Sequence, residues 1–290
     1  MPNTTANGLQ IEYDTFGDKT SPAVLLIAGL SAQMIFWPAD FCQKLSDRGF
    51  YVVRFDNRDV GLSTKFHEKG IPDMKAAQQG KNFAPPYTLE DMADDAIGLL
   101  DALDIQKAHF CGVSMGAMIT QIIGYRKPER VLSLISIMGS TGDPGLPPAT
   151  SEAMEMLIKP APAEKEPYIA YVVALLKVFW GSLEFDDELV REHAAQTFDR
   201  SFYPPGVIRQ HAAILASDNR KSRLAAINAP TLVIHGSEDP LLPVDHGIDT
   251  AGSIPNARIL IIQRMGHCLP KATWPQIIDA IAAHAASAAP

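Results

Sequence analysis

The sequence contains few cysteines, and they form no pattern that could organise a fold. Among 290 residues there are three, Cys42, Cys111 and Cys268, with no CxxC pair and no Cys/His spacing typical of zinc sites. A disulfide framework needs paired thiols, and a structural zinc site needs closely spaced ligands. Both classes of protein are therefore excluded, and we expect the thiols to be reduced.

Positive charge is also scarce. Lysine and arginine together number 25 against 33 acidic residues, so the formal net charge is −8. A protein that binds nucleic acid needs a concentrated basic surface to neutralise phosphates. The composition therefore argues against a nucleic-acid partner.

The sequence has no long apolar run. The nearest, YIAYVVALLKVFW at 168–180, is short for a membrane span and is broken by Lys177. The N-terminal MPNTTANGLQIEYD has neither the basic patch nor the apolar stretch of a secretion signal. We therefore expect a cytoplasmic protein with no membrane partner.

Apolar strand patterns alternate with helical patterns along much of the chain, and apolar residues make up 47 % of it. A chain of this length and composition can bury a sizeable core. Strands are predicted over 9–16, 23–28, 50–55, 108–113, 131–137, 231–235 and 258–263. Helices are predicted over 89–103, 115–126 and 273–287. This alternation indicates an α/β fold, in which a mostly parallel sheet carries helices on both faces.

Two segments depart from the alternation. The composition of residues 64–87 predicts a long polar loop. Residues 143–222 carry helical patterns without a convincing strand. We interpret the second segment as a helical cap inserted into the sheet domain. The expected cap helices lie near 151–158, 164–181, 186–200 and 206–217. The predicted domains are a core of 1–142 and 223–290 and a cap of 143–222.

One motif makes a specific chemical prediction. Gly112-Val113-Ser114-Met115-Gly116 lies between an apolar strand and a helix. In this context G-x-S-x-G predicts a nucleophile elbow, a sharp turn that lifts the serine hydroxyl above the sheet. Side chains two residues to either side would collide, so both positions require glycine. The elbow lies at the carboxyl edge of the strands, where open α/β sheets bind ligands.

The serine hydroxyl needs a base to become a nucleophile. Of the eight histidines, His267 follows the last predicted strand and can reach back over the sheet edge towards Ser114. His235 ends a strand, and we assign its side chain to the packing of that strand. His267 is therefore the candidate base.

The base in turn needs a carboxylate that fixes its tautomer. Asp239 follows the strand 231–235 and emerges at the same sheet edge, while Pro240 is expected to begin a helix directly after it. Asp143 is the alternative acid, and Asp245 is less suitable because it lies within a predicted helix. The proposed triad is thus completed by Asp239.

These three turns resemble the α/β-hydrolase family over nearly the whole chain. The order Ser114, Asp239, His267 and the motifs G-V-S-M-G, G-S-E-D-P and M-G-H match that fold. Residues 56–63, DNRDVGLS, resemble its D-x-R-G-x-G-x-S loop, with Asp59 in place of a glycine. This variant and the elbow are similar to those of bacterial esterases related to aclacinomycin methylesterase.

The resemblance implies an eight-stranded sheet and an oxyanion hole formed by the backbone N–H groups of Leu30 and Met115. It also implies a carboxylesterase that cleaves esters of small apolar acids or alcohols through an acyl-enzyme. Its partner would be a small-molecule ester, and it would need no metal or cofactor. Many relatives have His-Gly before the first donor, whereas Ala28-Gly29 here lacks a side chain that often braces the loop.

Aromatic residues beside these motifs are candidates for the substrate pocket, because such pockets are mostly lined by apolar side chains. Phe36 and Trp37 follow the oxyanion loop, and Phe179 and Trp180 end a predicted cap helix. The same four side chains could instead pack the cap against the core.

The sequence is also compatible with other functions. Acidic residues within 184–188 of the cap would suit an aminopeptidase that binds a substrate amine. Lactonases and carbon–carbon bond hydrolases use the same triad. A non-catalytic ligand receptor on the same scaffold is a further alternative, and the chain could be a monomer or a homodimer.

Overall fold

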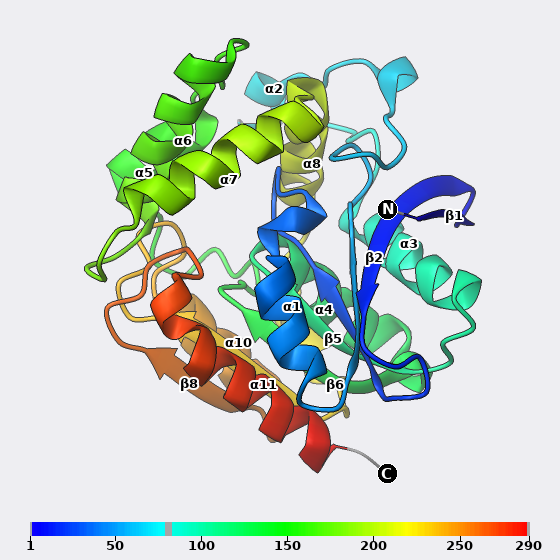
Figure 1. Ribbon diagram of the computed structural model, residues 1–290. Helices are drawn as coiled ribbons and strands as arrows, with labels where there is room; N and C mark the ends of the chain where they lie inside the picture. Colours follow the sequence, from blue (N-terminus) through cyan, green and yellow to red (C-terminus); the bar gives the residue numbers. More distant parts are fainter. Residues whose placement is uncertain (1, 79–82, 289–290) are drawn as a thin grey trace.

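A computed structural model describes residues 2–78 and 83–288 and contains one eight-stranded sheet (Figure 1). The strand order is β1-β2-β4-β3-β5-β6-β7-β8. β2 pairs antiparallel with β1 and β4, whereas the remaining neighbours are parallel. The strands are β1 (Asn3–Ala6), β2 (Leu9–Phe16), β3 (Ala23–Ile27), β4 (Tyr51–Phe55), β5 (Ala108–Val113), β6 (Val131–Ile137), β7 (Thr231–Gly236) and β8 (Arg258–Ile262).

Helices cover both faces of this sheet, as the sequence predicts. On one face, α1 (Ala39–Ser46) and α11 (Trp274–Ser287) bury apolar side chains in a shared core cluster. On the other face lie α3 (Leu89–Ala102) and α4 (Met115–Arg126), continued by α9 (Lys221–Leu224) and α10 (Asp245–Ser253). The α/β-hydrolase arrangement is therefore present, with the sheet between two apolar cores.

The parallel register brings the carboxyl ends of the central strands to one edge. Ile27 of β3 pairs with Gly112 of β5, and Val113 of β5 pairs with Ile137 of β6. Gly236 of β7 pairs with Ile262 of β8. The turns that follow β3, β5, β7 and β8 consequently meet at this edge, where the candidate site residues lie.

Four longer helices lie between β6 and β7 in the chain. They are α5 (Ser151–Ile158), α6 (Lys165–Phe179), α7 (Asp187–Arg200) and α8 (Pro204–Leu215). In Figure 1, α5, α6 and α7 form a group to one side of the sheet, while α8 lies beside α2 (Met74–Gln78). The division into core and cap at 143 and 222 stays a prediction.

Several boundaries differ from those expected. α8 begins at Pro204 rather than at 206, because proline suits the first turn of a helix. Pro240 does not begin a helix, and α10 starts only at Asp245. β1 has four residues and α1 has no side-chain cap, so neither gave a signal in the sequence.

The polar segment 64–87 is mostly irregular in its described part. It contains η2 (His67–Lys69) and α2, and residues 79–82 lie outside the described residues. The remaining single-turn helices are η1 (Met34–Phe36), η3 (Pro128–Arg130) and η4 (Lys271–Thr273). Within residues 2–78 and 83–288, no helix combines the length and hydropathy needed to cross a bilayer.

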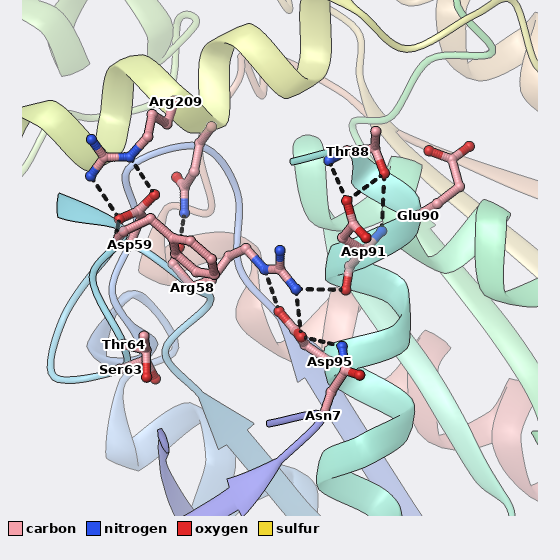
Figure 2. A network of polar contacts seen from close by, with 12 residues as sticks. Asn7, Arg58, Asp59, Ser63, Thr64, Thr88, Glu90, Asp91, Asp95 and Arg209 are labelled. Carbon is pink, nitrogen blue, oxygen red and sulfur yellow. Dashed lines mark hydrogen bonds and ion pairs between the residues drawn. The ribbon is translucent and has the colours of Figure 1, made fainter. Parts of the chain in front are cut away.

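A reciprocal pair of hydrogen bonds caps the start of α3. Thr88 accepts a hydrogen bond from the N–H of Asp91, and the Asp91 carboxylate accepts one from the N–H of Thr88 (Figure 2). This reciprocal pair satisfies two backbone donors that a helix start leaves open. It fixes where α3 begins and hence how it covers the sheet.

Candidate active site

Ser114 occupies a strained turn between β5 and α4. Its backbone has φ 54° and ψ −117°, a conformation that residues other than glycine rarely adopt. Its N–H donates to the carbonyl oxygen of Ile137 at 2.9 Å, which ties the turn to β6. The residue is partly exposed at the carboxyl edge of the sheet, so its hydroxyl is accessible to a ligand.

The two glycines of the motif are required by space. A Cβ at Gly112 would lie 2.1 Å from the carbonyl oxygen of Gly116. A Cβ at Gly116 would lie 2.2 Å from the carbonyl oxygen of Ile27. Both distances are far inside van der Waals contact, so the steric expectation for the elbow is confirmed.

His267 lies in the turn after β8, and the end of α6 helps to anchor it. The backbone N–H of His267 donates to the carbonyl oxygen of Phe179 at 2.6 Å. The backbone N–H of Gly266 donates to the carbonyl oxygen of Trp180 at 2.9 Å. A short antiparallel bridge joins Gly181 to Met265. The end of α6 therefore fixes the backbone from which the imidazole projects.

Asp239 lies in the turn after β7, and its two carboxylate oxygens have different partners. Oδ1 accepts from the N–H groups of Leu241 and Leu242 at 2.9 and 2.8 Å, which holds a non-helical turn. Oδ2 faces His267. Burial disfavours the charged carboxylate, but the imidazoles of His267 and His235 outweigh it and hold the pKa of Asp239 well below its ordinary value.

Ser114, His267 and Asp239 form one hydrogen-bonded line. The Nε2 of His267 lies 3.0 Å from Ser114 Oγ, and its Nδ1 lies 2.6 Å from Asp239 Oδ2. In this arrangement Nε2 can accept the serine proton while Nδ1–H donates to the carboxylate. Asp143, the alternative acid, instead pairs with Lys221 at 2.8 Å, so the geometry favours Asp239.

The two candidate oxyanion donors belong to segments that adjoin Ser114. Met115 is the first residue of α4, where backbone N–H groups point out of the helix end. In the turn after β3, a Cβ at Gly29 would lie 3.3 Å from Ser114 Cβ. Leu30 follows directly, so its N–H is carried by a segment that packs on the nucleophile.

The aromatic candidates after the oxyanion loop are packed differently from each other. Trp37 is fully buried, and its ring lies against the rings of Phe36 and Phe41 at centroid distances of 5.4 Å. Phe36 is partly buried beside the same core cluster. Trp37 therefore belongs to the core, which leaves Phe36 as the more accessible of the two pocket candidates.

The aromatic candidates at the end of α6 also have separate surroundings. The Phe179 ring lies edge-on to the His267 imidazole at a centroid distance of 6.0 Å. Trp180 packs on Phe185 at 4.9 Å and donates its Nε1–H to the carbonyl oxygen of Glu184. Phe179 thus borders the triad, whereas Trp180 stabilises the segment after α6.

A second histidine contacts the carboxylate of Asp239, and the sequence did not reveal this contact. His235 is fully buried, with Nε2 2.8 Å from the carbonyl oxygen of Leu242 and 3.5 Å from Asp239 Oδ2. Gly247 makes room for it, because a Cβ there would lie 2.6 Å from His235 Nδ1. His235 packs within its strand as expected and also lies within ion-pair distance of the Asp239 carboxylate.

Metal ligands are not gathered in the described part of the chain. There, no group of three or more histidine, cysteine, aspartate or glutamate side chains is placed to hold an ion.

Comparison with known proteins places this chain in a family. Residues 22–270 match the α/β-hydrolase fold family, and the chain belongs to that family. It is 30 % identical to rhodomycin D methylesterase DauP of Streptomyces sp. (strain C5), over 98 % of this chain and 97 % of that protein. It is also 30 % identical to rhodomycin D methylesterase DnrP of Streptomyces peucetius, over 94 % and 93 %. The resemblance to methylesterases seen in the sequence is confirmed.

A solved structure supports the fold independently. The chain aligns with a meta-cleavage product hydrolase of Pseudomonas fluorescens IP01 with a TM-score of 0.78 and 21 % identity. The alignment covers 100 % of this chain and 98 % of that one. This likeness extends to the whole chain, including the inserted helices.

Proposed function

We propose that this chain is a serine carboxylesterase that hydrolyses esters of small apolar acids or alcohols through an acyl-enzyme. The broader assignment is a carboxylic ester hydrolase of the α/β-hydrolase fold. It follows from 30 % identity to two methylesterases over nearly the full length of the chain. The observation that carries the finer proposal is the hydrogen-bonded line from Ser114 through His267 to Asp239.

In the first half of the reaction, Ser114 Oγ attacks the ester carbonyl while His267 Nε2 takes its proton. The N–H groups of Leu30 and Met115 donate to the oxyanion of the tetrahedral intermediate. The C–O bond to the alcohol then breaks, and the alcohol leaves with the proton from His267. Asp239 stays ionised throughout and stabilises the imidazolium.

In the second half, a water molecule gives a proton to His267 and attacks the acyl carbon. The bond to Ser114 Oγ breaks, the serine recovers its proton, and the carboxylic acid is released. Because the full-length relatives are methylesterases, methyl esters are the first substrates to test. In that case the alcohol released is methanol.

Two of the acidic residues that suggested an aminopeptidase already have partners. Asp186 accepts a hydrogen bond from the N–H of Leu189 and caps α7. Asp187 forms ion pairs with Lys177 and Arg191. These carboxylates are already used within the insertion, so they are poorly suited to bind a substrate amine.

The test compares the parent with Ser114→Ala on p-nitrophenyl esters and methyl esters of rising acyl length. We expect turnover by the parent and a loss of about four orders of magnitude or more in kcat for the variant. Ser253→Ala, a change of another partly exposed serine at the end of α10, serves as the matched control. Stoichiometric labelling of Ser114 by a fluorophosphonate without turnover of any ester would indicate a ligand receptor instead.

A further inference from the structure

The segment that carries Leu30 is a tight turn. The N–H of Ala32 donates to the carbonyl oxygen of Gly29 at 3.3 Å, which closes a four-residue turn. The carbonyl of Gly29 and the N–H of Leu30 belong to one planar peptide group and point in opposite directions. The bond to Ala32 therefore directs the Leu30 N–H outward from the turn.

Ser31 is under backbone strain in this turn. Its φ of 64° is the value that a type II turn requires at the third residue, where glycine is preferred. A type I turn has the same ends but a negative φ there, and it suits serine better. The two turns differ by a flip of the peptide between Leu30 and Ser31, so the observed orientation needs an external support.

Gln210 of α8 supplies that support. Its Oε1 accepts from the N–H of Ser31 at 3.0 Å, while its Nε2 donates to the carbonyl oxygen of Arg58 at 2.8 Å. The second bond fixes which end of the amide faces the turn. With the peptide flipped, the carbonyl of Leu30 would meet the amide oxygen of Gln210, which is repulsive. Gln210 is fully buried, so water cannot readily replace it.

The helix that presents Gln210 is itself held on the loop after β4. Arg209 donates to both carboxylate oxygens of Asp59, at 2.8 and 2.9 Å, and both side chains are buried (Figure 2). Gly206 lies against the same loop, because a Cβ there would be 2.0 Å from the carbonyl oxygen of Asp59. Gln210 is thus carried by a rigidly docked element rather than by a free surface helix.

We propose that Gln210 is a positioning residue of the oxyanion hole. It holds the N–H of Ser31 and the strained φ of that residue, and the turn that carries the Leu30 N–H thereby stays seated against Ser114 instead of relaxing away from it. This inference rests on the proposed esterase mechanism, in which that N–H stabilises the oxyanion. One side chain of the inserted segment would then control the rate of the chemical step.

The experiment measures Gln210→Met with p-nitrophenyl acetate and a trifluoromethyl ketone, which forms a tetrahedral adduct with an active-site serine. We expect kcat to fall about 10- to 100-fold, somewhat less than the loss of an oxyanion donor outright. KM should change by less than about twofold, since the interaction is made only in the transition state. Affinity for the ketone should fall in parallel with kcat/KM.

Gln121→Met is the matched control. Gln121 is also buried, lies on α4, and accepts a hydrogen bond from Arg220 at 3.3 Å. The Gln121→Met variant carries the same replacement, and its kcat should lie within about twofold of that of the parent. Should Gln210→Met fail to fold, Gln210→Asn keeps the amide but is one methylene too short to reach Ser31.

A second change separates positioning from general destabilisation. Adding Ser31→Gly to Gln210→Met should restore several-fold of the lost kcat, because glycine adopts a positive φ without strain. The inference is overturned if Gln210→Met loses no more kcat than Gln121→Met, if the loss is mainly in KM, or if Ser31→Gly restores nothing. Full activity of Ser114→Ala would contradict the proposed function itself, whereas a Ser114-dependent enzyme indifferent to Gln210 would contradict only this inference.

Discussion

Non-glycine residues with a positive φ recur at or beside the site. Three of them are Ser114 with φ 54°, Ser31 with φ 64° and Asp59 with φ 71°. Each is held by a long-range contact, namely the carbonyl of Ile137, the amide of Gln210 and the guanidinium of Arg209. Such backbone strain persists only where the surroundings enforce it. The geometry of the site therefore depends on these supports as well as on the triad.

The charge state of Asp239 leads to a prediction about pH. Because its pKa is held well below the ordinary value, the carboxylate stays ionised throughout the mildly acidic range. Protonation of Asp239 should therefore not contribute to any loss of activity in this range. A profile of kcat/KM against pH should fall with a slope of no more than one proton on its acid side. A slope for two protons would contradict an Asp239 that stays ionised.

At the scale of the elements, α8 is joined to the loop after β4 by buried polar contacts. Arg209 of α8 pairs with Asp59 in the loop after β4, and Arg58 of the same loop pairs with Asp95 of α3 (Figure 2). The Arg209 contact holds the pKa of Asp59 below its ordinary value, even though burial alone would raise it. These pairs connect three segments that are distant in the chain.

Breaking the Arg209–Asp59 pair should destabilise the protein. Arg209→Met would leave the buried Asp59 carboxylate without its cation, which costs about 3 kcal/mol or more of unfolding free energy. Adding Asp59→Gly removes the stranded charge and suits the positive φ, so the double variant should recover part of that loss. Urea unfolding of both variants measures this. A double variant less stable than Arg209→Met would contradict it.

At the scale of the whole molecule, several histidines lie in buried or half-buried surroundings that favour the neutral imidazole. Burial lowers the pKa of His109, His193, His211 and His284, and takes that of His109 to about 4. The unfolded chain therefore binds more protons than the folded one in mild acid. By linkage, the stability of the fold must decrease as the pH falls through this range.

His109→Gln tests this acid sensitivity. His109 lies in β5 with its Nδ1 2.8 Å from Ser133 Oγ. Its contribution to stability is present above the ordinary value of 6.5 and is lost as the pH falls to about 4, on the order of 3 kcal/mol in total. Urea unfolding at pH 7 and pH 4.5 should show a smaller loss for the variant than for the parent. An equal loss in both proteins would show that His109 does not contribute.

From the sequence alone, the fold class, the nucleophile elbow and the order of the proposed triad residues could be predicted. These follow from local patterns: apolar strands alternating with helices, and two glycines whose steric need can be read within five residues. The turn after each strand was also predictable, because parallel strands bring their carboxyl ends to one edge. Short or uncapped elements such as β1 and α1 had no such local signal.

Which of these groups touch depends on the packing of segments that are distant in the chain. Ser114 and His267 are 153 residues apart, and Ser31 and Gln210 are 179 apart. The preference for Asp239 over Asp143, the contact of His235 with that carboxylate, and the support of Ser31 by Gln210 all depend on how distant segments pack. A single sequence encodes such contacts only through the complete fold, since no local spacing distinguishes a buried glutamine that holds a turn from one that merely fills the core.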